Sequence, residues 1–233
     1  MASDVGATGI LPTLPIVGRS ERFAVHRIYC VGRNYAAHVR EMGRDPTREA
    51  PFFFLKPADA IVDSGAVVPY PPRTQNLHHE AELVVALGHG GANVPSELSL
   101  SLVFGYAVGN DLTRRDLQLA ARDAGRPWDT GKSFDACAPV GAIHPVAAVG
   151  HLSRGAIWLT VNGVRRQSAD LSQLIWSVPE LIAELSTLYT LAPGDLIFTG
   201  TPEGVGPLVV GDTVEVGVNG LAALTHTIGP ARD

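Results

Sequence analysis

EAELVVALG, at residues 80–88, is a short and almost unbroken apolar run, rich in β-branched residues and followed by glycines. A second run, SLVFGYAVGND at 101–111, has the same character and ends in Asn110 and Asp111. Runs of this length and composition are typical of strands that are buried inside a sheet. We therefore predict two core strands, each bordered by acidic residues at one end.

Further strands are predicted on both sides of this pair. The segments are RIYCVG (27–32), FFFLK (52–56), AIWLTVNG with VRRQSA (156–169) as a hairpin through Asn162-Gly163, PGDLIFTG (193–200), GDTVEVGV (211–218) and LAALTHTI (221–228). Asn-Gly is a strong signal for a tight hairpin turn. The fold class that follows is α+β and rich in strands.

Three helices interrupt the strands. AAHVREM (36–42) follows Asn34 as its expected cap, and Gly43 ends it. DLQLAARDA (116–124) follows a capping box formed by Thr113 and Asp116, and LIAELSTLY (181–189) follows a second one formed by Ser177 and Glu180.

Composition excludes several classes of protein. The chain has 233 residues, of which 45% are hydrophobic and 18% charged, so it should fold around a core. The net charge of -5 argues against nucleic-acid binding. Two cysteines cannot build a disulfide framework, and neither a signal peptide nor a membrane-spanning run is evident, so a cytoplasmic location is expected. Residues 1–23 are expected to be an extension whose ordering needs a partner surface, and residues 24–233 to form one folded domain.

Acidic residues at the ends of the two core strands suggest a metal site. Glu80 and Glu82 stand two apart on a strand, so both side chains project from one face and repel each other unless a cation lies between them. Asp111 can supply a third oxygen, and such a set prefers Mg²⁺ or Mn²⁺. The alternative is a solvated strand face with no metal.

His38 and Glu41 form a second candidate pair. Three residues apart on a helix, they are neighbours, so the carboxylate can orient the imidazole as a general base that acts on water. The alternative is an ordinary surface contact.

Six blocks, in order, carry a resemblance to a known family. They are GRNYAAH (32–38), FFFLKP (52–57), NLHHEAEL (76–83), GNDLTRRDLQ (109–118), WDTGKSFD (128–135) and FTGTPEGVGP (198–207). Together, over residues 24–230, they resemble the fumarylacetoacetate hydrolase family and, within it, the short single-domain acylpyruvate hydrolases. The resemblance implies a mixed β-roll and a homodimer.

The resemblance also implies a set of site residues. Glu80, Glu82 and Asp111 match the ligands of a Mg²⁺ or Mn²⁺ ion, while His38 and Glu41 match a catalytic dyad on a lid. The other matching positions are Lys132 in catalysis, and Arg33, Tyr35, Arg115, Gln118 and Thr201 around the substrate.

The implied activity is hydrolysis of the carbon–carbon bond of a 2,4-dioxo acid. The leading expectation is cleavage of fumarylpyruvate to fumarate and pyruvate in gentisate degradation, with Arg40 or Arg44 facing the far carboxylate. Decarboxylation of oxaloacetate, action on another acylpyruvate, isomerisation or hydration of a related oxo-acid, and non-catalytic binding of an oxo-acid are the alternatives.

Overall fold

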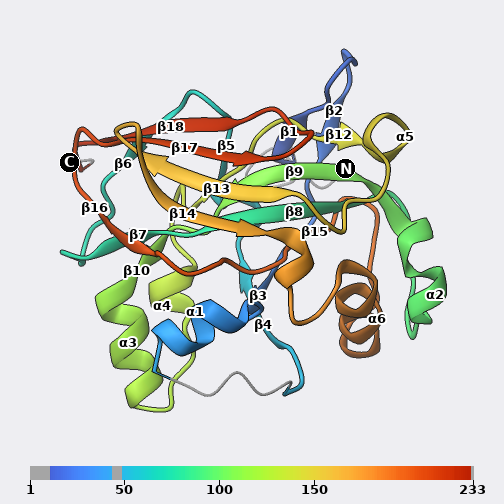
Figure 1. The fold of residues 1–233 in the computed structure, drawn as a ribbon, viewed down its shortest axis with the longest axis horizontal. Coiled ribbons are helices and arrows are strands. Elements are labelled where there is room, and N and C mark those ends of the chain that lie inside the picture. Colours follow the sequence, from blue (N-terminus) through green and yellow to red (C-terminus); the bar gives the residue numbers. More distant parts are fainter. Residues whose placement is uncertain (1–10, 44–48, 232–233) are drawn as a thin grey trace, which may run out of the picture.

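The computed structural model describes residues 11–43 and 49–231. Two mixed sheets face each other, as Figure 1 shows. The larger sheet contains, in spatial order, β12 (His144–Pro145), β9 (Val103–Asn110), β8 (Ala81–Leu87), β15 (Leu196–Phe198), β3 (Ile28–Gly32) and β4 (Phe52–Lys56). Among the described strands of this sheet, only β15 and β3 pair in parallel.

The second sheet contains β14 (Val164–Asp170), β13 (Ala156–Val161), β17 (Thr213–Val218), β18 (Leu224–Gly229) and β6 (Val67–Pro69). β13 and β17 contact β8 and β9, so the core lies between the sheets. β8 is buried along its whole length, because it has sheet neighbours on both edges and a covered face on each side. The strand-rich α+β fold, a mixed β-roll, is confirmed.

Three smaller sheets complete the strands. They are β10 (Thr113–Arg114), β7 (Leu77–His79) and β16 (Gly206–Leu208); β1 (Thr13–Pro15) with β2 (Arg22–Ala24); and β5 (Ile61–Val62) with β11 (Ala138–Pro139). Leu14 and Phe23 of the β1–β2 pair lie in the main core. The expectation that this segment needs a partner surface is therefore wrong for the part that the structure describes, because it packs on its own domain. The division of the chain at residue 24 stays a prediction.

Six α-helices are present in the described ranges. They are α1 (Ala36–Glu41), α2 (Ser96–Ser99), α3 (Arg115–Asp123), α4 (Asp129–Lys132), α5 (Val146–Val149) and α6 (Val178–Leu188), with 3₁₀ turns at Ala58–Ala60, Leu100–Leu102 and Leu171–Gln173. α1, α3 and α4 gather below the larger sheet near β4 and β7 (Figure 1). None of the helices in the described residues is long and apolar enough to cross a membrane.

Two of the predicted local motifs hold. The Ser177 amide donates to Glu180 Oε2 at 2.9 Å, which closes the expected capping box of α6. Asn162 and Gly163, both with positive φ, connect β13 to β14 as a hairpin.

Two predicted helix caps are wrong. Asp116 accepts instead from the hydroxyl of Thr74 at 2.6 Å, because Thr113 belongs to β10 and α3 begins only at Arg115. Asn34 does not cap α1; its amide donates to the backbone oxygens of Trp176 and Thr199 and ties loops together.

Candidate active site

Three carboxylates meet where β8 begins and β9 ends. Glu80 lies between β7 and β8, Glu82 lies in β8, and Asp111 follows β9. Antiparallel pairing brings the two strand ends together, and the Asp111 amide donates to the Glu80 backbone oxygen at 2.9 Å. One oxygen from each carboxylate lies within 4.8 Å of the others, and all three residues are buried. The sequence therefore located the convergence correctly.

Buried cations surround these carboxylates. Lys132 Nζ lies 2.8 Å from Glu80 Oε2 and 2.7 Å from Asp111 Oδ2. Arg115 forms an ion pair with Glu80, and Lys56 Nζ lies 2.8 Å from Asp111 Oδ1. Burying an unpaired charge is costly, so this pairing is what makes the acidic cluster tolerable inside the fold.

Glu80 and Glu82 have opposite protonation tendencies. Burial raises the pKa of Glu80, but the Lys132 and Arg115 cations outweigh it, and the net pKa lies well below its usual value. Burial, with the negative charges of Asp111 and Glu80, raises the pKa of Glu82 well above its usual value. The Gly200 amide donates to Glu82 Oε2 at 2.7 Å. Glu82 is thus the carboxylate least compensated by the protein.

The donor set fits a hard divalent cation. Its oxygens are carboxylate oxygens only, which suits Mg²⁺ or Mn²⁺ rather than zinc. Lys132 and the Gly200 amide hold carboxylate oxygens of the cluster in place, as supporting groups do in metal sites.

α1 brings His38 of the predicted dyad to the same cavity. His38 Nδ1 lies 3.1 Å from Glu41 Oε2, and His38 lines the cavity with the three carboxylates. Glu41 Oε1 also accepts from the Gly204 amide at 3.0 Å, so α1 is attached to the loop after β15. The hydrogen bond from His38 lowers the pKa of Glu41 in spite of partial burial. Nδ1 is thereby directed to Glu41, so Nε2 is the ring nitrogen that can accept a proton.

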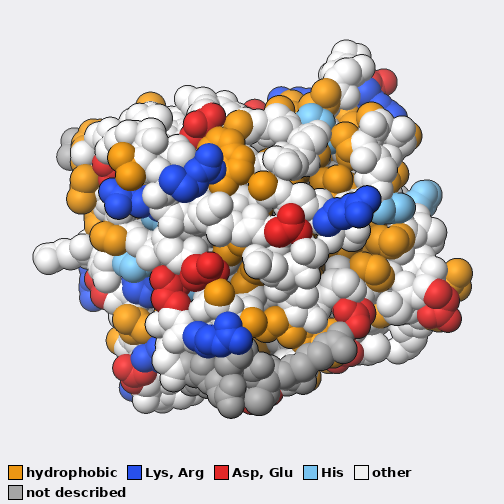
Figure 2. Space-filling view, in the orientation of Figure 1, with side chains coloured by type: hydrophobic (Ala, Val, Ile, Leu, Met, Phe, Trp, Pro, Cys, Tyr) orange, Lys and Arg blue, Asp and Glu red, His pale blue; other side chains and the backbone are white. Residues whose placement is uncertain are grey.

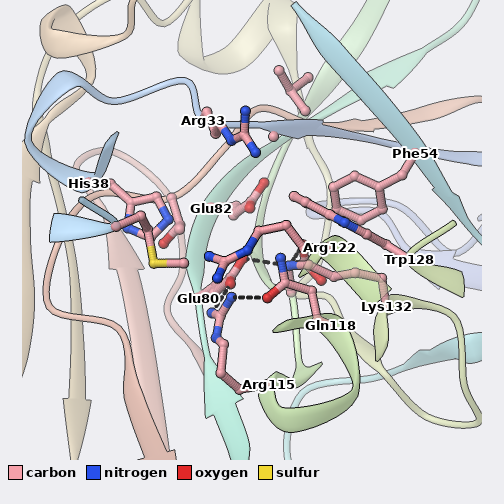
Figure 3. A pocket seen from close by; sticks show the side chains of 15 residues that line it. Arg33, His38, Phe54, Glu80, Glu82, Arg115, Gln118, Arg122, Trp128 and Lys132 are labelled. Carbon is pink, nitrogen blue, oxygen red and sulfur yellow. Dashed lines mark hydrogen bonds and ion pairs between the residues drawn. The ribbon is translucent and has the colours of Figure 1, made fainter. Parts of the chain in front are cut away.

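Most of the expected substrate contacts also line this cavity, as Figure 3 shows for several of them. Arg33, Arg115, Gln118, Thr201 and Lys132 are among its lining residues. Tyr35 is not: it is 1% exposed, and its hydroxyl is buried without a hydrogen-bond partner in the described residues. The structure therefore does not bring Tyr35 to the site.

The expectation for the far carboxylate is also changed. Arg40 is exposed on α1 and does not line the cavity, and Arg44 lies outside the described residues. Arg122 lines the cavity instead. It follows Arg115 and Gln118 on one face of α3, at a spacing of seven and four residues, a helical period that could have revealed it.

Sequence reasoning missed further residues. Phe54, Trp128 and Met42 form apolar walls of the cavity, and the Phe54 and Trp128 rings lie 6.0 Å apart. Lys56, fully buried behind Asp111, was missed as well. The sequence feature that could have revealed Lys56 is its position as the single charged residue at the end of the apolar strand β4.

Comparisons with known proteins agree with this geometry. The model of the fumarylacetoacetate hydrolase C-terminal domain matches residues 27–229. A fumarylpyruvate hydrolase of Ralstonia sp. is 52% identical over 193 residues, which cover 82% of this chain and all of the relative. The mitochondrial oxaloacetate tautomerase of Homo sapiens is 43% identical over 201 residues, which cover 86% of this chain and 90% of the relative.

A solved structure is similar over almost the whole chain. It is that of fumarylpyruvate hydrolase from Pseudomonas aeruginosa in complex with Mn²⁺ and pyruvate, with a TM-score of 0.96, 49% identity, and coverage of 98% of this chain and 100% of the other. From the extent of the family match and the identity to these relatives, this chain belongs to the fumarylacetoacetate hydrolase family.

Proposed function

We propose that this protein hydrolyses the carbon–carbon bond of a 2,4-dioxo acid with the help of Mg²⁺ or Mn²⁺, and that its substrate is fumarylpyruvate. The carrying observation is that three buried carboxylates and His38, whose Nδ1 is held by Glu41, line one cavity. The identity of 52% to a fumarylpyruvate hydrolase, and the Mn²⁺ and pyruvate in a similar structure, support this choice.

The cation would be held by Glu80, Glu82 and Asp111. When bound, it supplies electrostatic stabilisation to the oxo-acid end of the substrate and to the enolate that forms there. The three carboxylates are already balanced by the three cations Lys56, Lys132 and Arg115. A divalent ion would therefore leave the site positive, which favours an anionic ligand.

His38 is the proposed general base. Its Nε2 takes a proton from water, and the water oxygen bonds to C4 of the substrate while Glu41 holds Nδ1. The C3–C4 bond then breaks. C4 becomes a carboxyl carbon of fumarate, and the electron pair of the broken bond passes to C3, which gives a pyruvate enolate. The proton held on His38 Nε2 then passes to C3, which completes pyruvate and frees the base. Lys132, beside Glu80 and Asp111, stabilises the negative charge that develops during cleavage.

Arg33 and Arg122 are the proposed partners of the distal carboxylate of the fumaryl group. Both line the cavity and point toward it in Figure 3. The aromatic rings of Phe54 and Trp128 lie in the same wall, which suits a flat conjugated chain. These contacts are what favours a dicarboxylic substrate over a neutral acyl chain.

Substrate comparison tests the proposal. Loss of enol absorbance is followed with fumarylpyruvate and with acetylpyruvate, which lacks the distal carboxylate, in Mn²⁺ and in EDTA. We expect Arg122→Gln to lower kcat/KM for fumarylpyruvate by about tenfold or more and for acetylpyruvate by less than about threefold. Arg126→Gln, an exposed arginine outside the cavity, is the matched control. Turnover that is unaffected by EDTA, or equal for both substrates, would contradict the proposal.

Tautomerisation of oxaloacetate is a second candidate, because a named tautomerase is 43% identical. It moves a proton between C3 and the C2 oxygen and breaks no carbon–carbon bond. Detection of pyruvate from fumarylpyruvate, and of enol–keto conversion without pyruvate from oxaloacetate, separates the two activities from each other and from decarboxylation.

We further propose that the active form is a homodimer, as the family resemblance implies, and that it works in the cytoplasm, which suits its two free cysteines. Light scattering after size-exclusion chromatography gives the mass directly, against 24.6 kDa for one chain. Fractionation of the native host tests the location. A monomer with full activity would contradict the first part.

A further inference from the structure

Gln167 is a buried amide that lies outside the cavity and has no role in the mechanism above. It is 1% exposed, although its neighbours Arg166 and Ser168 are exposed. Strand alternation explains this, because Gln167 pairs with the buried Leu159 and so points to the same face. A β-bulge follows, since Thr160 pairs with Arg165 and Arg166 is an extra residue in β14. Gln167 thus reaches the junction of β7 and β8, where it contacts His79 and Ala81.

The hydrogen bonds of Gln167 fix the orientation of its amide. The Ala81 backbone N–H, which can only donate, lies 2.9 Å from Oε1, and the Pro202 backbone oxygen, which can only accept, lies 2.9 Å from Nε2. Oxygen and nitrogen therefore cannot be exchanged. His79 Nδ1 makes a further contact with Oε1 at 3.1 Å.

The same nitrogen donates to Thr201 Oγ1 at 2.9 Å. A hydroxyl has one proton to donate, and Gln167 leaves that proton unused because Thr201 is the acceptor. Across residues 11–43 and 49–231, no acceptor takes the Thr201 proton, while Thr201 lines the cavity beside the carboxylate cluster. The proton is therefore available to a ligand in the cavity.

The loop that carries Thr201 is supported at a second point of β14. A Cβ at Gly204 would lie 2.2 Å from the backbone oxygen of Arg166, and Gly204 has a φ of +88°. The loop thus packs directly on the bulge, and the Gly204 amide binds Glu41 from there. β14 holds the loop close to both the cavity and the dyad.

We propose that Gln167 is a positioning residue that makes Thr201 a hydrogen-bond donor to a carboxylate or oxo oxygen of the substrate. That substrate class rests on the proposed function, but the hydrogen-bond pattern does not. Gln167→Glu tests it, because an ionised carboxylate would accept the Thr201 proton and remove it from the cavity. Gln167→Met removes the hydrogen bonds at similar size and serves if the first variant does not fold.

Binding of oxalate to the Mn²⁺-loaded protein is the assay, measured by calorimetry for wild type, both Gln167 variants, Thr201→Val and the double variants. We expect each single substitution to weaken oxalate binding by about tenfold or more, since a hydrogen bond to a charged group is lost. In the Thr201→Val background, the Gln167 substitutions should add less than about twofold. Mn²⁺ affinity, measured separately by electron paramagnetic resonance, should stay within about threefold.

Additive effects in the double variants, oxalate affinity within twofold of wild type, or an equal fall in Mn²⁺ affinity would overturn the proposal. Ser186→Ala is the control for general destabilisation, because Ser186 is a buried polar residue of α6 that accepts from the Val94 amide and does not line the cavity. It should leave oxalate affinity unchanged. If wild type binds oxalate but cleaves no acylpyruvate, the proposed function fails while this comparison still decides the role of Gln167.

Discussion

Replacing Lys56 by methionine should make the metal-free protein much less stable and the metal-loaded protein only slightly so. Lys56 Nζ pairs with Asp111 Oδ1 at 2.8 Å, and both side chains are almost completely buried. The ammonium also donates to the Leu112 oxygen at 3.0 Å. Asp111 outweighs the effect of burial and raises the pKa of Lys56, so the lysine is charged at every relevant pH.

The magnitude follows from these contacts. Removing one partner of a buried ion pair costs about 3–5 kcal/mol, because the other charge stays buried. Lys132 still pairs with Asp111, so we expect the lower end, about 3 kcal/mol. For a domain of this size each kcal/mol lowers Tm by about 2–4 °C, which gives a fall of about 6–12 °C in EDTA. A divalent cation restores positive charge near Asp111 and should recover at least half of that fall.

Thermal unfolding followed by intrinsic fluorescence, with EDTA or with saturating Mn²⁺, checks this expectation. Arg22→Met is the matched control, because Arg22 pairs with Asp63 at the same distance of 2.8 Å but both side chains are roughly half exposed. It should lower Tm by less than about 4 °C, and equally in both conditions. A fall of less than 3 °C for Lys56→Met in EDTA, or the same fall with Mn²⁺, would refute the reasoning.

Two further predictions concern the His38–Glu41 dyad and the buried His226. Glu41→Gln should lower kcat by about a hundredfold with little change in KM, because His38 loses the carboxylate that holds Nδ1. The loss of enol absorbance measures kcat, and Glu97→Gln, on the exposed face of α2, is the control. An unchanged kcat would remove Glu41 from the mechanism. Burial lowers the pKa of His226 to about 4, so between pH 6.5 and 4 the unfolded chain binds more protons than the folded one. The free energy of unfolding should therefore decrease by about 3 kcal/mol as the pH is lowered from 6.5 to 4. Urea unfolding at several pH values shows this, and an identical pH slope for His226→Gln would contradict it.

The chemistry-bearing positions could be predicted because they depend on local spacing. Strand alternation puts Glu80 and Glu82 on one face, and the helical period puts His38 beside Glu41, whatever the rest of the chain does. The strand-rich fold followed from short apolar runs and the Asn162-Gly163 turn, for the same reason.

Contacts between distant segments could not be predicted in this way. Thr113 and Asp116 have the spacing of a capping box, but the pairing of β10 with β7 places Asp116 against Thr74. Tyr35 lies between the cavity residues Arg33 and His38 in the sequence, yet it is buried and does not line the cavity.

Sequence alone therefore identified the family and the class of fold, and it predicted both the cluster of three carboxylates and the contact between His38 and Glu41. Only the tertiary structure decided that Lys56 compensates Asp111, that Arg122 rather than Arg40 lines the cavity, and that pairing with Leu159 places Gln167 on the buried face of β14. The physical reason is that the charge and spacing of side chains are properties of the local sequence, whereas their burial and their partners depend on which distant strands pack against them.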